Sequence, residues 1–227
     1  MAVISYESGK GMTQGALNYV VVEGPIGVGK SRLTEQLAER LGGEALLERS
    51  QENPFLERFY RNPREGAFPT QLFFLMQRAE LLSHVRQSDL FQPRVVGDFL
   101  FAKDRLFAEL NLDAHEFALY DRVWQSLSPG VPAPDLVIYL QAPVEVLQAR
   151  LRKHAVGPEA RLDTEYLERL AGAYVDFFHH YSESPVLIVN SAGIDPAGDE
   201  RHLDLLIEEM HRARTGRHYF NPDMSVL

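Results

Sequence analysis

Eight residues near the amino terminus constrain this chain more than any other segment. Residues 24–31 read GPIGVGKS and match the pattern G-x-x-x-x-G-K-S at every specified position. Such glycines let backbone N–H groups surround phosphate oxygens, while the lysine reaches the β- and γ-phosphates and the serine hydroxyl binds Mg²⁺. The pattern therefore predicts a nucleotide-binding loop made of Gly24, Pro25, Ile26, Gly27, Val28, Gly29, Lys30 and Ser31.

The segments on either side of this loop fit a strand followed by a helix. Residues 18–23 (NYVVVE) form a continuous apolar run, which is typical of a strand buried on both faces of a sheet. Apolar residues then recur at helical spacing as far as the Gly-Gly pair at 42–43, where the helix is expected to end. The phosphates would thus lie at a helix N-terminus, where unpaired N–H groups and the helix dipole favour anions.

Strand-like and helix-like segments alternate along the rest of the chain. The expected strands lie at residues 18–23, 43–48, 94–98, 135–140 and 185–190, and further helices at 54–61, 70–85, 104–110, 114–127, 143–153, 163–181 and 201–214. This alternation predicts an α/β fold of the P-loop NTPase type, a three-layer α/β/α arrangement with a five-stranded parallel sheet and a short lid. We expect a leader at 1–17, one domain at 18–214 and a C-terminal tail at 215–227.

Composition argues against several classes of function. The chain has 227 residues, a formal net charge of −9 and no cysteine. We therefore expect no broad nucleic-acid surface and no disulfide or thiolate chemistry. The sequence contains no secretory signal and no apolar run near the ~20 residues that span a bilayer. These features predict a cytoplasmic protein with no membrane partner.

Acidic residues end the first three expected strands. They are Glu23, Glu48 and Asp98. In open parallel sheets, ligands bind at the carboxyl ends of the strands. A phosphoryl-transfer enzyme needs one carboxylate to accept the proton of the acceptor hydroxyl and another to hold Mg²⁺, directly or through water. Glu48 and Asp98 are the candidates, although either alone could equally be a solvated carboxylate at a strand end.

One face of the helix expected at 70–85 combines polar and apolar residues. Gln71 and Arg78 are seven residues apart, about two helical turns, and share this face with leucines. An amide and a guanidinium in such a setting could line a pocket and bond to the edge of a nucleobase. The alternative is a pair that reaches solvent from the edge of the helix.

Cations gather where the helix at 143–153 gives way to an irregular segment at 154–162. The cluster consists of Arg150, Arg152, Lys153 and His154. Cations at a helix C-terminus can interact favourably with the helix dipole. Alternatively, the segment could be a lid that closes over phosphates and supplies positive charge in the transition state. Position alone leaves both interpretations open.

Taken together, several segments resemble one protein family. Besides the loop, they comprise Glu48, residues 52–56 (ENPFL), Tyr60, residues 71–75 (QLFFL), Arg78, residues 98–107 (DFLFAKDRLF), 135–140 and 184–190 (SPVLIVN). Over roughly residues 18–214 the chain resembles the deoxynucleoside kinases, particularly their bacterial deoxyadenosine/deoxyguanosine kinase branch. The resemblance implies ATP as phosphoryl donor, Mg²⁺ as cofactor, and a homodimer formed through long helices such as the one at 70–85.

The resemblance implies a role for each position that would face the acceptor. Glu48 would be the general base that takes the proton from the deoxyribose 5′-hydroxyl. The pair that binds the 3′-hydroxyl would be Tyr60 and Glu159. The edge of the nucleobase would be read by Gln71, Arg78 and Asp104.

It also implies roles on the donor side. Arg150 would be the lid arginine that faces the transferred phosphoryl group, and Lys30 would be the second catalytic cation. Arg152 and His154 would lie beside ATP, and the loop after Asn190 would touch its adenine. Asp98, with Ser31, would be the acid beside Mg²⁺.

Three regions depart from the family pattern, and one of them is the loop after Glu48, where Ser50 and Gln51 stand where relatives often have proline. Phe99 follows the acid at position 98, where many members of the family have an arginine that reaches the phosphates. Lys103 or Arg105 could then supply that charge. In the lid, His154 and Val156 stand where arginine is common, and histidine is neutral much of the time at pH 7.

We therefore expect transfer of the γ-phosphoryl group of ATP to the 5′-hydroxyl of a purine deoxynucleoside, for nucleotide salvage. A kinase for deoxycytidine or for several deoxynucleosides stays open, because Arg78 with Asp104 could also address cytosine. A thymidylate-type nucleoside monophosphate kinase would need an extra cation for the phosphate of its acceptor. A nucleotide-dependent switch without catalysis is a remote alternative, since the chain has no guanine-reading N-K-x-D sequence.

Overall fold

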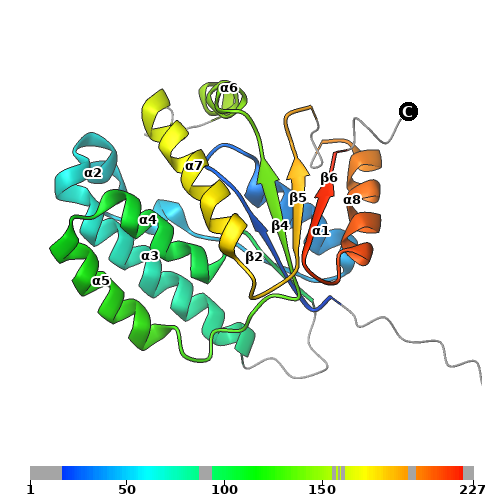
Figure 1. The fold of residues 1–227 in the computed structure, drawn as a ribbon, viewed down its shortest axis with the longest axis horizontal. Coiled ribbons are helices and arrows are strands. Elements are labelled where there is room, and N and C mark those ends of the chain that lie inside the picture. The colour runs from blue at the N-terminus through cyan, green and yellow to red at the C-terminus, as the bar shows by residue number, and fades with distance from the viewer. Residues whose placement is uncertain are drawn as a thin grey trace, which may run out of the picture.

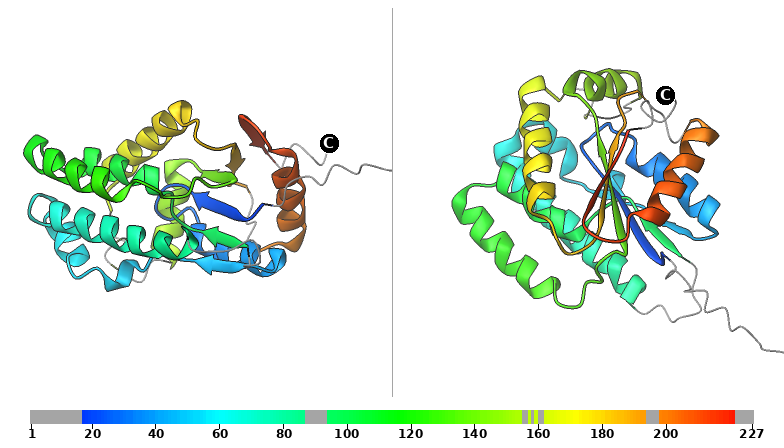
Figure 2. Two further views of the ribbon diagram at one scale, coloured as in Figure 1. Left: turned by 90° about the horizontal axis from the view of Figure 1, so that it is seen from below. Right: turned by 45° about the vertical axis from the view of Figure 1, so that its right-hand side comes forward.

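A parallel sheet forms the centre of the molecule and helices cover both of its faces (Figure 1, Figure 2). The computed structural model describes residues 17–86, 94–154, 157, 159, 162–193 and 198–221. The strands are β1 (Tyr19–Glu23), β2 (Glu44–Leu46), β3 (Val95–Gly97), β4 (Leu136–Gln141), β5 (Val186–Asn190) and β6 (Arg217–Phe220). Their order is β2-β3-β1-β4-β5-β6, and every pair is parallel. The predicted three-layer α/β/α fold is confirmed.

The sheet has six strands, so the predicted count of five is wrong. The additional strand, β6, lies within the predicted C-terminal tail and pairs with β5, with Val186 opposite Arg217. Its four residues read RHYF, and only Phe220 is buried. A strand this short at the edge of a sheet carries no apolar run, which is why the sequence did not reveal it.

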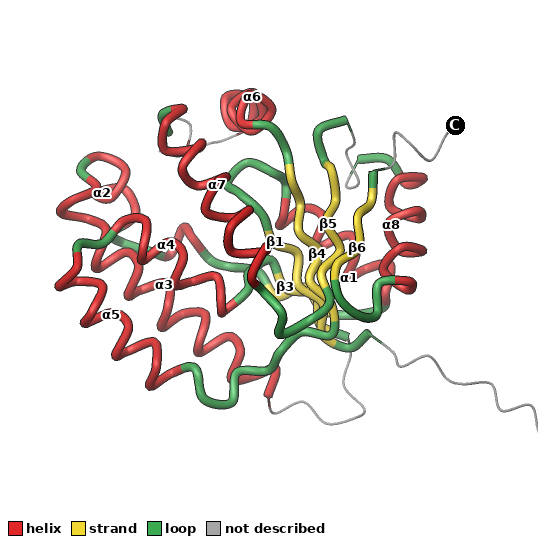
Figure 3. Tube along the Cα trace, in the orientation of Figure 1, coloured by secondary structure: helices red, strands yellow, loops and turns green. Residues whose placement is uncertain are grey.

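The helices divide between the two faces of the sheet, which lies in the middle of Figure 3. They are α1 (Lys30–Leu41), α2 (Leu56–Arg61), α3 (Pro63–Arg86), α4 (Asp104–Asn111), α5 (Ala114–Leu127), α6 (Val144–His154), α7 (Thr164–His180) and α8 (Glu200–Arg212). Helices α1 and α8 pack with Val20 and Val22 of β1 in a mainly aliphatic core. Helices α3, α4, α5 and α7 pack with Tyr19 and Val21 in a core rich in aromatic rings. The alternation of β1 side chains between these cores accounts for its continuous apolar sequence.

The helices after β2 begin at different places from those predicted. Helix α2 starts at Leu56 rather than at residue 54, and the Oδ1 atom of Asn53 accepts a hydrogen bond from the Phe55 amide at 3.0 Å. Helix α3 starts at Pro63 rather than at residue 70 and continues through Pro69. A Cβ atom at Gly66 would lie 2.3 Å from the Phe59 amide nitrogen, so glycine lets the two helices pack closely. A proline usually interrupts a helix. Here α3 continues through Pro69 because packing against α2 supports its first turns.

Some predicted features lie outside the described residues. These are the leader up to residue 16, Val156, most of the predicted lid, residues 194–197 of the loop after Asn190, and the tail from residue 222. Among the helices that the structure describes, none is long and apolar enough to cross a membrane.

Candidate active site

The loop at residues 24–31 joins β1 to α1, as predicted. Gly27 has a φ of +83°, and a Cβ atom at this position would lie 2.8 Å from the Cγ atom of Leu151 on α6. Glycine is therefore required there both by backbone conformation and by the close approach of α6. Gly29 immediately precedes α1 and has a φ of +102°, which directs the first N–H groups of that helix toward the loop.

Lys30 folds back over this loop. Its Nζ atom donates hydrogen bonds to the carbonyl oxygens of Gly24, at 2.8 Å, and Pro25, at 3.3 Å. Both interactions are internal to the loop, and Lys30 also lines the adjoining cavity. A phosphate group would therefore compete with two backbone carbonyls for this ammonium group.

Ser31 and Asp98 meet although 67 residues separate them. The Ser31 hydroxyl donates to Oδ2 of Asp98 at 2.6 Å, and the Glu48 amide donates to Oδ1 at 2.7 Å. Burial raises the pKa of Asp98, and the charge of Glu48 adds to this, whereas the two hydrogen bonds lower it. A hydroxyl and a carboxylate beside a phosphate-binding loop are the oxygen ligands that Mg²⁺ prefers. The two residues predicted to hold the metal therefore fit that role.

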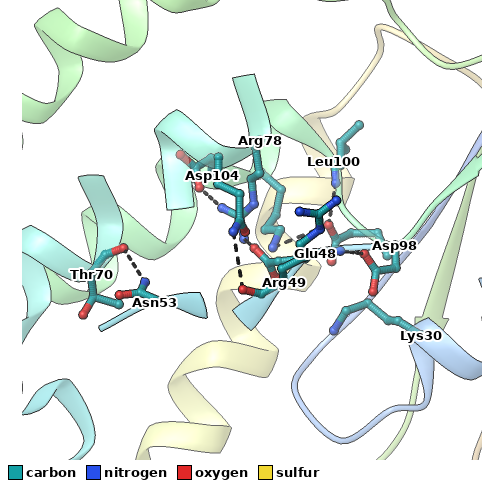
Figure 4. A network of polar contacts seen from close by, with 12 residues as sticks. Lys30, Glu48, Arg49, Asn53, Thr70, Arg78, Asp98, Leu100 and Asp104 are labelled. Atoms are coloured by element: carbon teal, nitrogen blue, oxygen red, sulfur yellow. Dashed lines mark hydrogen bonds and ion pairs between the residues drawn. The ribbon is translucent and has the colours of Figure 1, made fainter. Parts of the chain in front are cut away.

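Glu48 lies two residues beyond β2 and forms an ion pair with Arg78 of α3 (Figure 4). Burial by itself would raise the pKa of Glu48, but the positive charges of Arg78, Lys103 and Lys30 outweigh burial and lower it. The carboxylate is therefore ionised near neutral pH and can accept a proton. This state is the one that a general base requires before reaction.

Arg78 bridges two carboxylates from different parts of the chain. Its guanidinium pairs with Glu48 on one side and with Asp104, the first residue of α4, on the other. The Tyr120 hydroxyl on α5 donates a hydrogen bond to Asp104. Figure 4 shows Glu48, Arg78 and Asp104 in one polar network, with Lys30 and Asp98 nearby. One predicted base-reading residue, Arg78, is thus paired directly with the predicted general base, and a second, Asp104, is connected to it through Arg78.

Most of the predicted site residues line one cavity of about 700 Å³. The loop contributes residues 26–31, and the other predicted residues on its wall are Glu48, Tyr60, Gln71, Arg78, Asp98, Arg150, His154 and Glu159. A cavity of this size is typical of small-molecule sites. Asp104 lies fully buried behind Arg78 and off the wall, and Arg152 is exposed on α6 away from it. Arg152 is therefore not brought into the site in this structure.

Gln71 gives the wall an amide group that has no internal partner. The residue is 3% exposed, and within the described part of the chain its side chain makes no hydrogen bond. Phe74, one turn further along α3, lines the same cavity. The centre of its ring lies 5.2 Å from the Cζ atom of the Arg78 guanidinium. Because the Gln71 side chain lines the cavity, a ligand that enters could form hydrogen bonds with its amide.

Tyr60 and Glu159 approach the cavity from separate segments. Burial raises the pKa of the Tyr60 hydroxyl, and the charge of Glu159 raises it further. The hydroxyl therefore stays protonated and can donate a hydrogen bond, while the Glu159 carboxylate can accept one. The geometry suits a ligand hydroxyl placed against both groups.

Arg150 on α6 is held close to the phosphate-binding loop. It donates to the Val28 carbonyl oxygen at 3.2 Å and to the Ser191 carbonyl oxygen at 2.5 Å. His154 lies at the end of the same helix, on the cavity wall. These contacts place the predicted lid arginine between the phosphate-binding loop and the segment after β5.

Sequence reasoning assigned no role to three polar or aromatic residues around Glu48. Phe74 could have been found, because it shares the helix face of Gln71 and Arg78. Tyr120 donates a hydrogen bond to Asp104 and Tyr174 donates one to Glu23. Nothing near either tyrosine in the sequence indicates these contacts. Phe99 is fully buried in the aromatic core and does not reach the cavity.

Lys103 and Arg105, the two residues that could supply the charge missing at Phe99, lie in different surroundings. Lys103 lines the cavity, whereas Arg105 pairs with Asp121 at 3.1 Å and lies away from the cavity wall. Of these two cations, Lys103 is therefore the one placed to contribute charge to this site.

A phosphate-binding loop that shares a cavity with a buried carboxylate and an unpaired amide defines a nucleotide-dependent phosphotransferase with the P-loop NTPase fold. The family model described as deoxynucleoside kinase matches residues 20–213. The chain belongs to the deoxynucleoside kinase family and is a phosphotransferase, which confirms the resemblance seen in the sequence.

Individual relatives support this assignment. A deoxyguanosine kinase of Bacillus subtilis is 34% identical over 160 residues, which cover 69% of this chain and 76% of the relative. A deoxyadenosine/deoxycytidine kinase of the same organism is 26% identical, with coverage of 84% and 90%. The structure of deoxyadenosine kinase from M. mycoides with bound dATP superposes with a TM-score of 0.74 and 22% identity, covering 85% of this chain and 98% of that one. This last similarity concerns the fold.

Proposed function

We propose that this enzyme transfers the γ-phosphoryl group of ATP to the 5′-hydroxyl of a purine deoxynucleoside, for nucleotide salvage. The observation that carries the proposal is one cavity with two kinds of wall. Lys30 and Ser31 line the phosphate-binding part of this cavity, and Gln71 and Arg78 line another part. Glu48 lines the same cavity. Donor and acceptor can therefore occupy one enclosed space, as phosphoryl transfer requires.

On the donor side, the phosphates would bind the N–H groups of the loop and displace Lys30 from its two carbonyl partners. Ser31 and Asp98 would hold Mg²⁺, which when bound neutralises charge on the β- and γ-phosphates. Arg150 would donate to the transferred phosphoryl group from α6. His154 already lies on the cavity wall, whereas Arg152, which is exposed, would lie beside ATP only after movement of α6.

On the acceptor side, Glu48 would take the proton of the 5′-hydroxyl. The carboxylate is ionised, because Arg78 and the neighbouring lysines lower its pKa. Tyr60 and Glu159 would bind the 3′-hydroxyl as donor and acceptor. Catalysis would then consist of positioning and charge stabilisation, which are the main contributions of proteins to phosphoryl transfer.

Preference for a purine rests on the group formed by Gln71, Arg78 and Asp104. An amide can bond to adjacent donor and acceptor atoms of adenine, and a guanidinium to two acceptors of guanine. Relatives named as deoxyguanosine and deoxyadenosine kinases support this choice. A relative named as a deoxyadenosine/deoxycytidine kinase favours deoxycytidine as the second candidate.

A monophosphate acceptor is disfavoured by the charge of the wall. Glu48 and Glu159 would both repel an acceptor phosphate, and the Arg78 guanidinium is already shared by two carboxylates. The acceptor part of the cavity therefore suits an uncharged nucleoside.

The proposal is tested by steady-state phosphorylation with ATP and Mg²⁺. The acceptors compared would be deoxyadenosine, deoxyguanosine, deoxycytidine, thymidine, their ribonucleoside counterparts and deoxynucleoside monophosphates. We expect the highest kcat/KM with a purine deoxynucleoside. Turnover on monophosphates alone would refute the proposal, and a preference for deoxycytidine would correct only the base assignment.

We also propose a homodimer in the cytoplasm, with a single catalytic domain that extends through β6. Met76 of α3 and Leu119 of α5 are each more than half exposed, and α3 packs beside α5. A second copy could cover these apolar side chains. Analytical ultracentrifugation should give twice the mass of the chain, and the Met76→Glu/Leu119→Glu double variant should sediment as a monomer.

A further inference from the structure

Lys103 is a buried ammonium that the roles proposed above leave unused. It ends a short 3₁₀ helix at Phe101–Lys103 and immediately precedes α4. The residue is 3% exposed, yet it lines the same cavity as Lys30 and Glu48. Burying an ammonium is costly unless it has partners, so its surroundings indicate what it binds.

The Lys103 ammonium has fewer partners than its three N–H groups can serve. Its Nζ atom lies 3.5 Å from Oε2 of Glu23 and 4.5 Å from the centre of the Phe107 ring. Among the described residues Glu23 is the only carboxylate that forms an ion pair with this nitrogen, and no hydrogen bond from it is formed. Lys103 therefore keeps donors for an acceptor that enters the cavity.

Glu23 accepts hydrogen bonds from three other groups. Its carboxylate accepts hydrogen bonds at 2.9 Å from the amides of Gly24 and Leu100 and from the Tyr174 hydroxyl. Two of these neutral donors bond to Oε1 and one bonds to Oε2. Lys103 thus supplies a nearby counter-charge to Glu23 without being its hydrogen-bonding partner.

We propose that Lys103 is a catalytic cation, whose ammonium donates to a non-bridging oxygen of the phosphoryl group while that group is transferred. The inference rests on the proposed function. In the step, the acceptor O5′ forms a bond to the γ-phosphorus and its proton passes to Glu48. The bond from that phosphorus to the β,γ-bridging oxygen breaks, and the electron pair stays on ADP. Cations fixed beside the transferred group stabilise the charge that develops on its oxygens.

The first test compares two substitutions at position 103 with a matched control. Lys103→Met keeps the length of the side chain and removes its charge, so we expect kcat to fall at least about 100-fold. The KM values for ATP and for the deoxynucleoside should change less than about threefold, because the interaction strengthens in the transition state. Lys103→Arg should retain at least a tenth of kcat. Arg105→Met, which removes a cation two residues away and outside the cavity, should leave kcat within about twofold.

The dependence on pH gives a second readout. Burial lowers the pKa of Lys103 to about 8, with Arg78 and Lys30 acting in the same direction and Glu23 and Glu48 opposing them. The other group facing it, the Tyr174 hydroxyl, has a raised pKa because of burial and stays neutral. Since the ammonium is present below pH 8 and lost above it, kcat/KM of the native enzyme should fall above about pH 8. Lys103→Arg should lack this fall, because guanidinium keeps its proton. Identical alkaline profiles for the two enzymes would overturn the proposal.

A purely structural role makes different predictions. If Lys103 only balances the charge of Glu23, the double variant Lys103→Met/Glu23→Gln should recover kcat, and that recovery would overturn the proposal. If Lys103 acts on the phosphoryl group, the double variant should stay at least about 100-fold slower than the native enzyme while melting within a few degrees of it.

Binding of a transition-state mimic separates this inference from the proposed function. Titration calorimetry with deoxyadenosine would compare enzyme holding ADP and Mg²⁺ with enzyme that also holds aluminium fluoride, which mimics the transferred phosphoryl group. Aluminium fluoride should increase the affinity of the native enzyme for deoxyadenosine, and this increase should be at least about tenfold smaller in Lys103→Met. An equal increase in the two enzymes would overturn the inference. A native enzyme that phosphorylates no deoxynucleoside would instead refute the proposed function.

Discussion

At the scale of single residues, the environment of Glu48 determines what it can do. Its carboxylate is paired with Arg78 and its amide nitrogen donates to Asp98, so both its charge state and its position are fixed by neighbours. Its position in the sequence identified Glu48 only as an acid at a strand end, and the role of base was implied by the family resemblance. Its contacts with Arg78 of α3 and with Asp98 after β3, together with the nearby charge of Lys103, give it the properties of a base.

Glu48→Gln should lower kcat by roughly 100-fold or more and change ATP affinity little, because the amide cannot accept the hydroxyl proton. Steady-state kinetics and titration with ATP would measure the two effects. Glu52→Gln, an exposed acid on the same segment, is the control and should leave kcat unchanged within about twofold. A near-normal kcat in Glu48→Gln would remove Glu48 from the role of base.

Arg78→Ala should raise the KM for the deoxynucleoside at least about tenfold and leave the KM for ATP unchanged, since Arg78 lies with Gln71 and away from the phosphate loop. The substitution leaves Glu48 and Asp104 without their shared cation, which can cost about 3–5 kcal/mol of stability. Arg78→Lys therefore serves as a second variant that keeps a charge. The exposed Arg61 gives the control variant Arg61→Ala. Equal effects of Arg78→Ala on both KM values would contradict the assignment.

At the scale of elements, β6 shows how much an edge strand can depend on one side chain. Phe220 is 6% exposed and belongs to the aliphatic core beside α8, whereas its neighbour Tyr219 is 77% exposed. Side chains alternate across the sheet, so adjacent aromatic residues have very different surroundings.

Phe220→Ala should lower the free energy of unfolding by about 3 kcal/mol, because it leaves a cavity in the core. Tyr219→Ala should change it by less than about 0.5 kcal/mol. Urea denaturation followed by circular dichroism would measure both. Similar values for the two variants would show that β6 does not pack as described.

The elements differ in how far local sequence determines them. Strands β1, β4 and β5 were predicted almost to the residue, because central parallel strands require continuous apolar runs. The start of α3 and the existence of β6 were missed, because both depend on tertiary packing. The same division applies to the site. The phosphate loop is a local motif, whereas the contacts of Lys103, Tyr120 and Tyr174 arise only when distant segments meet.

At the scale of the whole molecule, the cavity connects segments that are far apart in sequence, from Ile26 to Tyr174. Its wall includes α1, α3, α6 and α7, so ligands that fill it should stabilise the fold as a unit. A ligand at 100 times its dissociation constant adds about 2.7 kcal/mol to the stability of the native state. For a chain of this size, that corresponds to a rise in Tm of roughly 5–10 °C.

We expect such rises with ATP and Mg²⁺ and separately with the preferred deoxynucleoside, measured by differential scanning calorimetry. Lys30→Met should lose the rise with ATP and keep the one with the nucleoside. Lys153→Met, which removes an exposed cation on α6, should keep both. A rise with ATP that survives in Lys30→Met would place the nucleotide elsewhere.

The Arg78 bridge has a consequence for engineering this enzyme. One guanidinium serves both the acid that would accept the proton and Asp104, which lies behind it and off the cavity wall. A substitution at Asp104 meant to admit a new nucleoside analogue would therefore also alter the charge felt by Glu48. Turnover and substrate choice cannot be optimised one after the other in this scaffold. Libraries that vary positions 71, 78, 104 and 120 together should yield active variants that single-site scans miss.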